Sequence, residues 1–215
     1  MSEYYPVYLK LPGRKCVVVG GGKVAERKVK SLLDCDASVY VISPKLTRWL
    51  EEATVRGDIT VARRNFTTTD LENAFLVIGA TDSCETNNLV AEECSARNIL
   101  VNIVDEPDKC NFIVPAVLRQ GPLSISISTD GKSPMLARRI REDLQSAFGD
   151  EYREFLDLMG DLREHIINNI PEQEKRKDIF HRLVYSDIID LLRDGQHEKV
   201  KERINHVLGS GWTQS

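Results

Sequence analysis

A glycine-rich turn near the N-terminus has the most recognisable chemistry in this sequence. The segment Gly20-Gly21-Gly22-Lys23-Val24-Ala25 has the form G-x-G-x-x-A, a variant of the dinucleotide-binding fingerprint. In that fingerprint the first glycine allows a tight bend, the second lets the backbone approach a pyrophosphate, and the final small residue lets a helix pack closely. The N-terminus of that helix would direct free N–H groups at the phosphates. We interpret the segment as a dinucleotide site, with a purely structural turn as the alternative.

Two further segments could contact the same dinucleotide. An acidic residue usually follows the second strand of such a fold and binds the adenine ribose, but this sequence has Ser43-Pro44-Lys45 there. The Ser43 hydroxyl would suit a ribose hydroxyl and Lys45 would suit a 2′-phosphate, so these residues leave NAD and NADP both open. Thr81 and Asp82 follow another apolar run and are also candidate cofactor neighbours. The alternative is that Asp82 or Ser83 caps the next helix.

Asp105 is the candidate acid–base residue. It follows the apolar run ILVNIV at 99–104, where a carboxylate could accept a proton while a hydride leaves a substrate. The alternative is a turn-forming aspartate ahead of Glu106-Pro107. The 4 histidines all lie beyond residue 164 without metal-ligand spacing, so we expect no metal site.

A basic segment further along the chain could bind an anionic substrate. Residues 115–141 hold five arginine and lysine side chains against the single acid Asp130. Hydroxyl side chains and a predicted helix N-terminus at Ser133 would add hydrogen-bond donors. A solvated basic helix face is the alternative. The candidate substrate-binding residues are Ser128, Thr129, Ser133, Arg138 and Arg139.

Short apolar runs that alternate with amphipathic segments indicate the scaffold for these residues. This alternation predicts a parallel sheet with helical crossovers. The predicted strands are 15–20, 37–42, 58–62, 74–80 and 99–104. The predicted helices are 21–34, a segment that opens at Pro44 and includes Ala53, and 85–97.

The pattern changes after about residue 113. Residues 112–118 and 123–128 flank a Gln120-Gly121-Pro122 turn and predict two antiparallel strands. Ser133-Pro134 has the form of a helix start, with serine as N-cap. We therefore predict an α/β protein with a Rossmann-like parallel sheet at 1–113, a small α+β dimerisation region at 114–150 and a helical C-terminal region at 151–215. The middle region is too small to form a core alone, which favours a homodimer.

Composition limits the classes of function. The net charge of −4 argues against broad nucleic-acid binding. No apolar run approaches the ~18 residues of a membrane span, and the first residues lack a signal-peptide layout. The 5 cysteines are scattered, as expected for reduced thiols. We expect a cytoplasmic protein with no membrane partner.

Four stretches of the sequence together match one family. They read VVVGGGKVAERK (17–28), ATD (80–82), NIVDEPDKCNFIVPA (102–116) and GPLSISISTDGKSPMLARRIR (121–141). Over roughly residues 3–150 they resemble the dehydrogenase/ferrochelatase domain of siroheme synthases. The S-T-x-G-x-S-P-x-L-A-R pattern is the most diagnostic, because Rossmann proteins in general lack it.

The resemblance implies a specific reaction. It implies NAD-dependent oxidation of precorrin-2 to sirohydrochlorin, tetrapyrroles whose acetate and propionate groups would suit the basic segment. It places the catalytic aspartate at Asp105, cofactor contacts at 20–24, 43–45 and Thr81, and substrate contacts at Ser128 and Thr129. It favours NAD over NADP and implies a homodimer through about 114–150.

Two alternatives remain open from the sequence. Some relatives also act as ferrochelatases that insert Fe²⁺ into sirohydrochlorin, and they carry the same motifs. A non-catalytic, NAD-sensing regulatory Rossmann protein would retain the glycine turn. That protein would have no need of Asp105 beside a basic, hydroxyl-rich segment.

Overall fold

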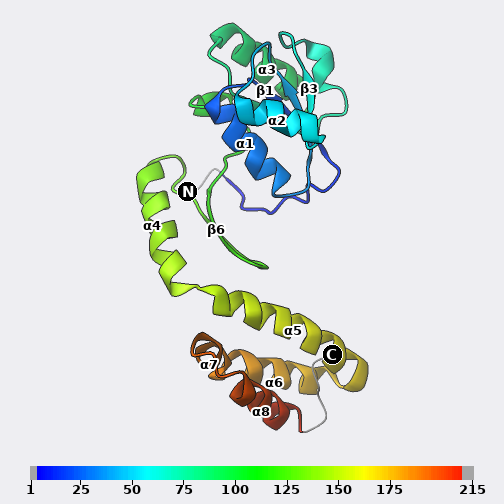
Figure 1. Ribbon diagram of the computed structural model, residues 1–215, viewed down its shortest axis with the longest axis vertical. Coiled ribbons are helices and arrows are strands. Elements are labelled where there is room, and N and C mark those ends of the chain that lie inside the picture. Colours follow the sequence, from blue (N-terminus) through cyan, green and yellow to red (C-terminus); the bar gives the residue numbers. More distant parts are fainter. Residues whose placement is uncertain (1–3, 210–215) are drawn as a thin grey trace. The chain divides into compact units, whose positions relative to one another are not determined.

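The first half of the chain forms a five-stranded parallel sheet, as the alternating pattern predicts (Figure 1). The computed structural model describes residues 4–209 and orders the strands β3-β2-β1-β4-β5. The strand order changes direction between β1 and β4, and ligands bind at the carboxyl ends beside such a switch point. The strands are β1 Lys15–Val19, β2 Ser38–Ile42, β3 Thr60–Ala62, β4 Leu76–Gly79 and β5 Leu100–Ile103.

Helices cover both faces of this sheet because successive side chains of each strand point to opposite sides. Helices α1 (Lys23–Leu33) and α2 (Arg48–Arg56) pack on the face that includes Cys16 and Val18. Helix α3 (Cys84–Ala96) and the short helix η1 (Thr68–Leu71) pack on the face that includes Val17 and Val19. A second short helix, η2 (Pro107–Lys109), follows β5.

The prediction that Pro44 opens the second helix is wrong. Helix α2 begins at Arg48, and the side chain of Thr47 caps it by accepting from the Leu50 N–H at 3.4 Å. The Ser43 hydroxyl donates to the Lys45 carbonyl at 2.7 Å, so the chain first makes a local turn. This turn occupies residues 43–46 and delays the helix.

The second unit, Pro115–Ser215, begins with an antiparallel hairpin. Strands β6 (Ala116–Gln120) and β7 (Leu123–Ile127) meet at Gly121-Pro122. Strand β6 starts later than predicted, because the preceding segment binds to β5. There the Asn111 side chain accepts a hydrogen bond from the Val101 N–H at 2.7 Å. Helix α4 (Pro134–Ala147) packs against β6, and the predicted N-cap at Ser133 is confirmed.

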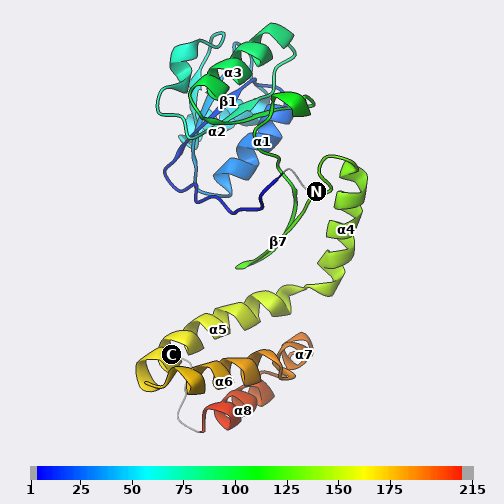
Figure 2. The same cartoon turned by 180° about the vertical axis from the view of Figure 1, so that it is seen from behind.

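In the described part of this unit, up to residue 209, four further helices follow α4 (Figure 2). They share a core in which Phe155, Leu158, Leu162 and Ile166 form one face of α5 at helical spacing. None of the helices in residues 4–209 is long and apolar enough to cross a membrane. Residues 115–150 and the later helices fall in the same compact unit, and the predicted division at 150 stays a prediction. These helices are α5 Asp150–Asn169, α6 Gln173–Val184, α7 Ile188–Arg193 and α8 His197–Leu208.

Candidate functional site

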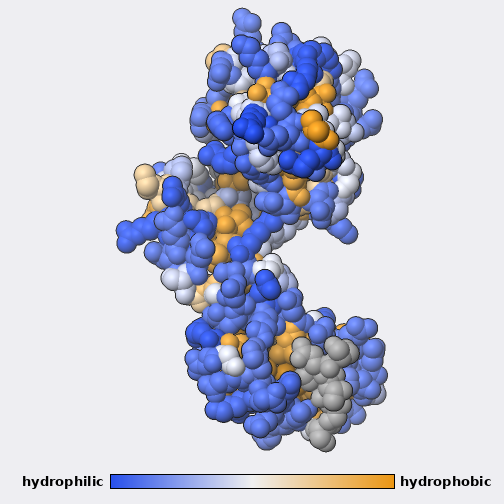
Figure 3. Space-filling view, in the orientation of Figure 1, coloured by the Kyte–Doolittle hydropathy of each residue, from blue (hydrophilic) through white to orange (hydrophobic). Residues whose placement is uncertain are grey.

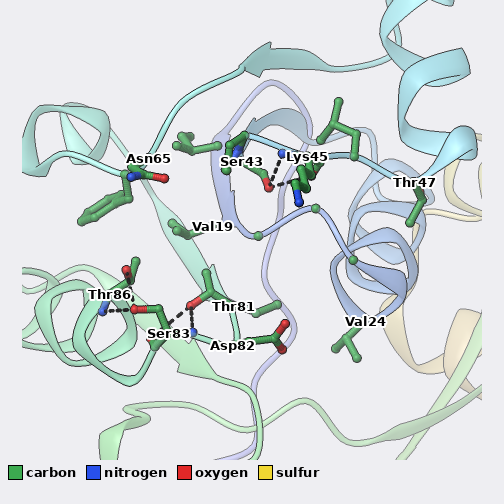
Figure 4. A pocket seen from close by; sticks show the side chains of 18 of the residues that line it. Val19, Val24, Ser43, Lys45, Thr47, Asn65, Thr81, Asp82, Ser83 and Thr86 are labelled. Atoms are coloured by element: carbon green, nitrogen blue, oxygen red, sulfur yellow. Dashed lines mark hydrogen bonds between the residues drawn. The ribbon is translucent and has the colours of Figure 1, made fainter.

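A cavity of about 660 Å³ lies at the carboxyl ends of β1, β2 and β4. The glycine turn crosses it, with Ser43 and Lys45 on one side and Thr81 and Asp82 on the other (Figure 4). The structure therefore brings together the three segments that the sequence predicts as cofactor contacts. Its volume is within the range of about 300–1,000 Å³ that is usual for ligand sites.

The three glycines of the turn have different roles. Gly20 has φ of +126°, and a Cβ there would lie 2.1 Å from the Ala80 carbonyl oxygen. A Cβ on Gly21 would lie 2.0 Å from the Lys45 carbonyl oxygen. Both positions therefore need glycine for the turn to pack between β4 and the loop after β2. A Cβ on Gly22 would meet nothing within 4 Å, so the third glycine leaves an open backbone surface that a ligand can approach.

Helix α1 starts at this open surface. Its N-cap is Gly22, which supplies no side-chain cap, so the first-turn N–H groups are available to an anion. The exposed Lys23 side chain lies 3.6 Å from Glu26, and Val24 is also exposed at the cavity. Hydrogen bonds from Lys30 and Thr47 lower the pKa of the Glu26 carboxyl to about 2. The Lys30 ammonium donates to Glu26 Oε1 at 2.7 Å, one turn along the same helix.

In the segment after β2, the Ser43 hydroxyl has a different role from the predicted contact with a ribose hydroxyl. Ser43 is buried, and because its hydroxyl proton is used in the bond to Lys45, its main role in the structure is to shape the turn. The segment after the neighbouring strand β3 contributes Arg64, Asn65 and Phe66 to the cavity, and sequence reasoning missed these residues. Arg64 is held by Asp70 through two hydrogen bonds of 2.8 and 2.6 Å. These residues follow the weak third strand, and no motif marks them.

The loop after β4 contains both a helix cap and residues that line the cavity, the two alternatives that the sequence left open. Ser83 caps α3 by accepting from the Thr86 N–H at 3.2 Å, while Thr81 and Asp82 line the cavity. Thr81 also donates to the buried side chain of Asn87 at 2.9 Å. Sequence reasoning missed Asn87, although its spacing from Val90 and Cys94 shows a polar residue on the buried face of a helix.

Asp105 lies at the same edge of the sheet, in the loop after β5. The Val104 N–H donates to the Gly79 carbonyl at 2.9 Å, which holds this loop beside the end of β4. Asp105 is exposed and does not line the cavity, and its carboxylate makes no hydrogen bond or ion pair within residues 4–209. Its φ of +61° is in the left-handed region, which costs a non-glycine residue on the order of 1 kcal/mol. Asp36, Asn73, Asn98 and Asp130 also have a left-handed φ, so the conformation alone does not distinguish Asp105. The Lys28 ammonium interacts electrostatically with the Asp105 carboxylate.

The candidate substrate residues lie in the second unit, in the turn before α4 and on that helix. The Ser128 hydroxyl accepts from the Asp130 N–H and the Thr129 hydroxyl from the Ser133 N–H, both at 3.1 Å. Each hydroxyl still has its own proton to donate. Ser133 uses its oxygen to accept from the Leu136 N–H at 3.3 Å. The turn is thus a compact set of hydroxyl donors.

The arginines of α4 are less free than the local charge count suggests. Arg138 pairs with Glu142 at 2.8 Å and Arg139 approaches Asp143 at 3.9 Å, one turn along the same helix. The two acids lie just beyond the segment counted in the sequence. Exposed pairs of this spacing contribute only about 0.3–0.5 kcal/mol, so an anionic ligand could compete for both guanidinium groups.

Histidine and cysteine side chains form no cluster in the described part of the chain. No group of three or more His, Cys, Asp or Glu residues gathers there in a way that could hold a metal ion. The cysteines are all free thiols, and burial raises the pKa of Cys16 and of Cys94 to about 11. Cys16 and Cys94 therefore remain protonated and unreactive at neutral pH.

Comparison with known proteins supports the same assignment along the chain. A family model described as "Putative NAD(P)-binding" matches residues 7–116, and "Sirohaem biosynthesis protein central" matches 120–147. A third, "Sirohaem synthase dimerisation region", matches 151–208. The chain belongs to the NAD(P)-binding siroheme synthase family. This family and the cavity both support a nicotinamide dinucleotide as cofactor.

Individual relatives of the family cover nearly the whole chain. Siroheme synthases of Thioalkalivibrio sulfidiphilus and Methylobacillus flagellatus are 35% and 36% identical over 97% and 96% of it. The chain spans less than half of those proteins, 43% and 44%. Among solved structures, "SirC, precorrin-2 dehydrogenase" matches with a TM-score of 0.80 and 28% identity, covering 96% of this chain and 100% of that one.

Proposed function

We propose that this chain is a cytoplasmic enzyme that uses NAD to oxidise precorrin-2 to sirohydrochlorin. The observation that carries the proposal is the pairing of a dinucleotide cavity with an unpaired, strained carboxylate at one edge of the same sheet. A siroheme synthase family member with this pairing, and with a structural neighbour named precorrin-2 dehydrogenase, fits that reaction. The free thiols suit a reducing compartment.

The residues around the cavity fit a dinucleotide. The open backbone at Gly22 and the uncapped first turn of α1 would bind the pyrophosphate. Lys45, Thr81 and Asp82 would contact the rest of the molecule. NAD supplies a hydride acceptor when it is bound. Three cations, Lys23, Lys45 and Arg64, line the cavity. We favour NAD over NADP because Asp70 already holds Arg64 in two hydrogen bonds, so this guanidinium is less available to a 2′-phosphate.

Asp105 would supply the acid–base chemistry. Oxidation of precorrin-2 removes a hydride and a proton, and the proton needs an acceptor. The Asp105 carboxylate is exposed and unpaired within residues 4–209, so its lone pairs are available for this role.

The second unit would recognise the substrate through its carboxylates. Precorrin-2 carries several acetate and propionate groups, and each can accept hydrogen bonds from a guanidinium or a hydroxyl. Arg138 and Arg139 offer the guanidinium groups, and the turn before α4 offers the hydroxyls. We propose that Ser128, Thr129 and Ser133 bind together with these arginines.

We also propose that the protein is a homodimer. A two-stranded hairpin is marginally stable alone and has two unpaired edges. Hydrophobic side chains are visible over β6 and β7 beside α4 (Figure 3), and Met135 and Leu136 of α4 are exposed. The family model named for dimerisation matches residues 151–208, which form the helices after α4. Light scattering should give twice the mass of 24.3 kDa, and a stable monomer at micromolar concentration would contradict the proposal.

The enzymatic proposal is tested by mixing the protein with precorrin-2 and NAD under anaerobic conditions. We expect stoichiometric NADH and sirohydrochlorin, with neither formed in a control without enzyme. An Asp105→Asn variant keeps the size and the left-handed preference of the residue but removes its basicity. Its kcat should fall by about 10²–10⁴-fold while NAD affinity stays unchanged.

Other outcomes identify the alternatives. NAD binding without NADH formation would favour a regulatory NAD-sensing protein. Near-normal turnover by Asp105→Asn would show that the aspartate is structural. Supplying sirohydrochlorin with Fe²⁺, beside a control without enzyme, shows separately whether the chain also inserts iron, with the metal as a substrate.

A further inference from the structure

A buried asparagine connects the two loops on which the proposed reaction depends. Asn87 lies in the first turn of α3, and only 6% of its surface is exposed. Its side chain lies between Thr81, in the loop after β4, and Glu106, in the loop after β5. Thr81 lines the dinucleotide cavity, whereas Glu106 directly follows Asp105. One amide therefore contacts both the cofactor side and the acid–base side of the sheet edge.

The hydrogen bonds of this amide determine its orientation. Thr81 Oγ1 donates to Asn87 Oδ1 at 2.9 Å, and Asn87 Nδ2 donates to the Thr81 carbonyl at 3.1 Å. The same Nδ2 donates to Glu106 Oε1 at 3.3 Å. A flipped amide would direct its oxygen at a carbonyl and a carboxylate, which are both acceptors. The site therefore requires a side chain that donates in one direction and accepts in the other.

Glu106 passes this restraint to the Asp105 turn. One of its carboxylate oxygens binds Asn87 and the other pairs with Lys109. Its backbone N–H donates to the Ile103 carbonyl at 3.3 Å, which closes the turn around Asp105. The turn with φ of +61° at Asp105 is thus held from the α3 side.

We propose that Asn87 is a positioning residue that couples occupation of the dinucleotide site to the placement of the Asp105 carboxylate. The inference rests on the proposed function, because it takes Thr81 as a cofactor neighbour and Asp105 as the proton acceptor. A ligand that orders the Thr81 loop also orders the amide and, through Glu106, the Asp105 turn. By linkage, the same contact makes a well-placed Asp105 turn favour cofactor binding.

An Asn87→Asp variant tests the coupling, because it keeps the shape of the side chain but replaces the donor with a carboxylate facing Glu106. Asn88→Asp is the matched control, since it adds the same charge at an exposed position of the same helix. We expect Asn87→Asp to weaken NAD binding and to lower kcat, each on the order of tenfold, with KM for precorrin-2 unchanged. Asn88→Asp should behave as the wild type does. Equal NAD affinity and kcat in the two variants would overturn the proposal.

A rescue variant separates repulsion from general damage. In the double variant Asn87→Asp with Glu106→Gln, the new amide at 106 can donate to the new carboxylate at 87. We expect it to recover most of the lost kcat. No recovery would show that the link to Glu106 does not carry the effect and would also count against the coupling.

Hydrogen exchange provides a measurement that does not depend on any variant. In the wild-type protein, NAD should slow amide exchange in residues 103–110 as well as at the cavity, and Asn87→Asp should abolish the first effect only. If the wild type shows no NAD-dependent change at 103–110, the coupling is wrong even when Asn87→Asp fails to fold. If wild type binds NAD and shows that change but does not oxidise precorrin-2, the proposed reaction fails while the coupling stands.

Discussion

The two units of this protein present their candidate ligand groups in different ways. In Met1–Val114 the groups are mostly backbone N–H donors, placed by the glycine turn and by the first turn of α1. In Pro115–Ser215 they are exposed arginine side chains and the hydroxyls of one turn. Backbone donors fixed by a sheet lose little freedom when a ligand binds, whereas each arginine loses up to about 2 kcal/mol of rotamer entropy. The first unit therefore offers donors in fixed positions, and the second offers mobile, positively charged side chains.

The largest effect should follow from substitution within the glycine turn. Gly20→Ala places a Cβ 2.1 Å from the Ala80 carbonyl oxygen at a φ of +126°, and we expect a loss of at least about 3 kcal/mol in the free energy of unfolding. Gly22→Asp meets no neighbour and should fold normally, but its charge opposes the pyrophosphate. Its NAD affinity should fall by at least about tenfold. Denaturant unfolding measures the stability of Gly20→Ala, and calorimetry measures the NAD affinity of Gly22→Asp. If Gly20→Ala were as stable as the wild type, the glycine turn would not be fixed by its packing and the contrast between the two units would fail.

A smaller effect is expected for the arginines of the second unit. Arg138 and Arg139 are adjacent and point about 100° apart on the helix, so the two side chains face different directions. We expect at least one of them to contact a substrate carboxylate. Alanine at that position should raise the apparent KM about fivefold, and more at low salt, because an exposed ion pair contributes up to about 1 kcal/mol. The free energy of unfolding should change by less than about 0.5 kcal/mol. Unchanged kinetics for both variants at every salt concentration would show that α4 merely has a solvated basic face.

Relief of backbone strain should give a small gain in stability. Asp105→Gly removes the left-handed conformation of a non-glycine residue and should raise the free energy of unfolding by about 0.5–1 kcal/mol, while turnover falls. Asn98, with φ of +54°, is a matched position that the proposed reaction does not use. Asn98→Gly should leave turnover intact. A loss of stability in Asp105→Gly would show that the aspartate side chain stabilises its loop.

The last comparison concerns acid stability and sets a buried carboxyl against an exposed one. The pKa of Glu26 is about 2 in the folded protein against an ordinary value of 4.5, so folding releases protons from this group. Its contribution is complete above pH 4.5 and is lost as the pH falls from 4.5 towards 2. Unfolding of Glu26→Gln should therefore depend less on pH in that window than unfolding of the wild type.

Glu142→Gln is the control for this experiment. Pairing with Arg138 lowers the pKa of Glu142 as well, but the pair is exposed and salt screens it. At physiological salt its pH dependence should stay close to that of the wild type. Equal slopes for Glu26→Gln and the wild type would show that the Glu26 contacts do not persist in solution.

Patterns among residues close together in the sequence were sufficient to predict most of the helices and strands and part of the candidate site. The strand and helix alternation follows from apolar periodicity, and the sheet order confirms it. Ser133 as N-cap follows from the Ser-Pro pair at a helix start. The glycine turn could be found because its backbone geometry needs glycine at a spacing visible within six residues.

The remaining features depend on segments that meet across the sheet. Gly21 is required because the Lys45 carbonyl packs on it, and the bend that places this carbonyl also moves the start of α2 from Pro44 to Arg48. Asn87 and Glu106 are 19 residues apart, yet they share a hydrogen bond because β4 and β5 are neighbours. Neither partner has a local signal for the other, since the free energy of such a contact exists only once the sheet has formed. Spacing along the chain therefore predicted the glycine turn, whereas the hydrogen bonds that join α3 to the Asp105 loop required the folded sheet.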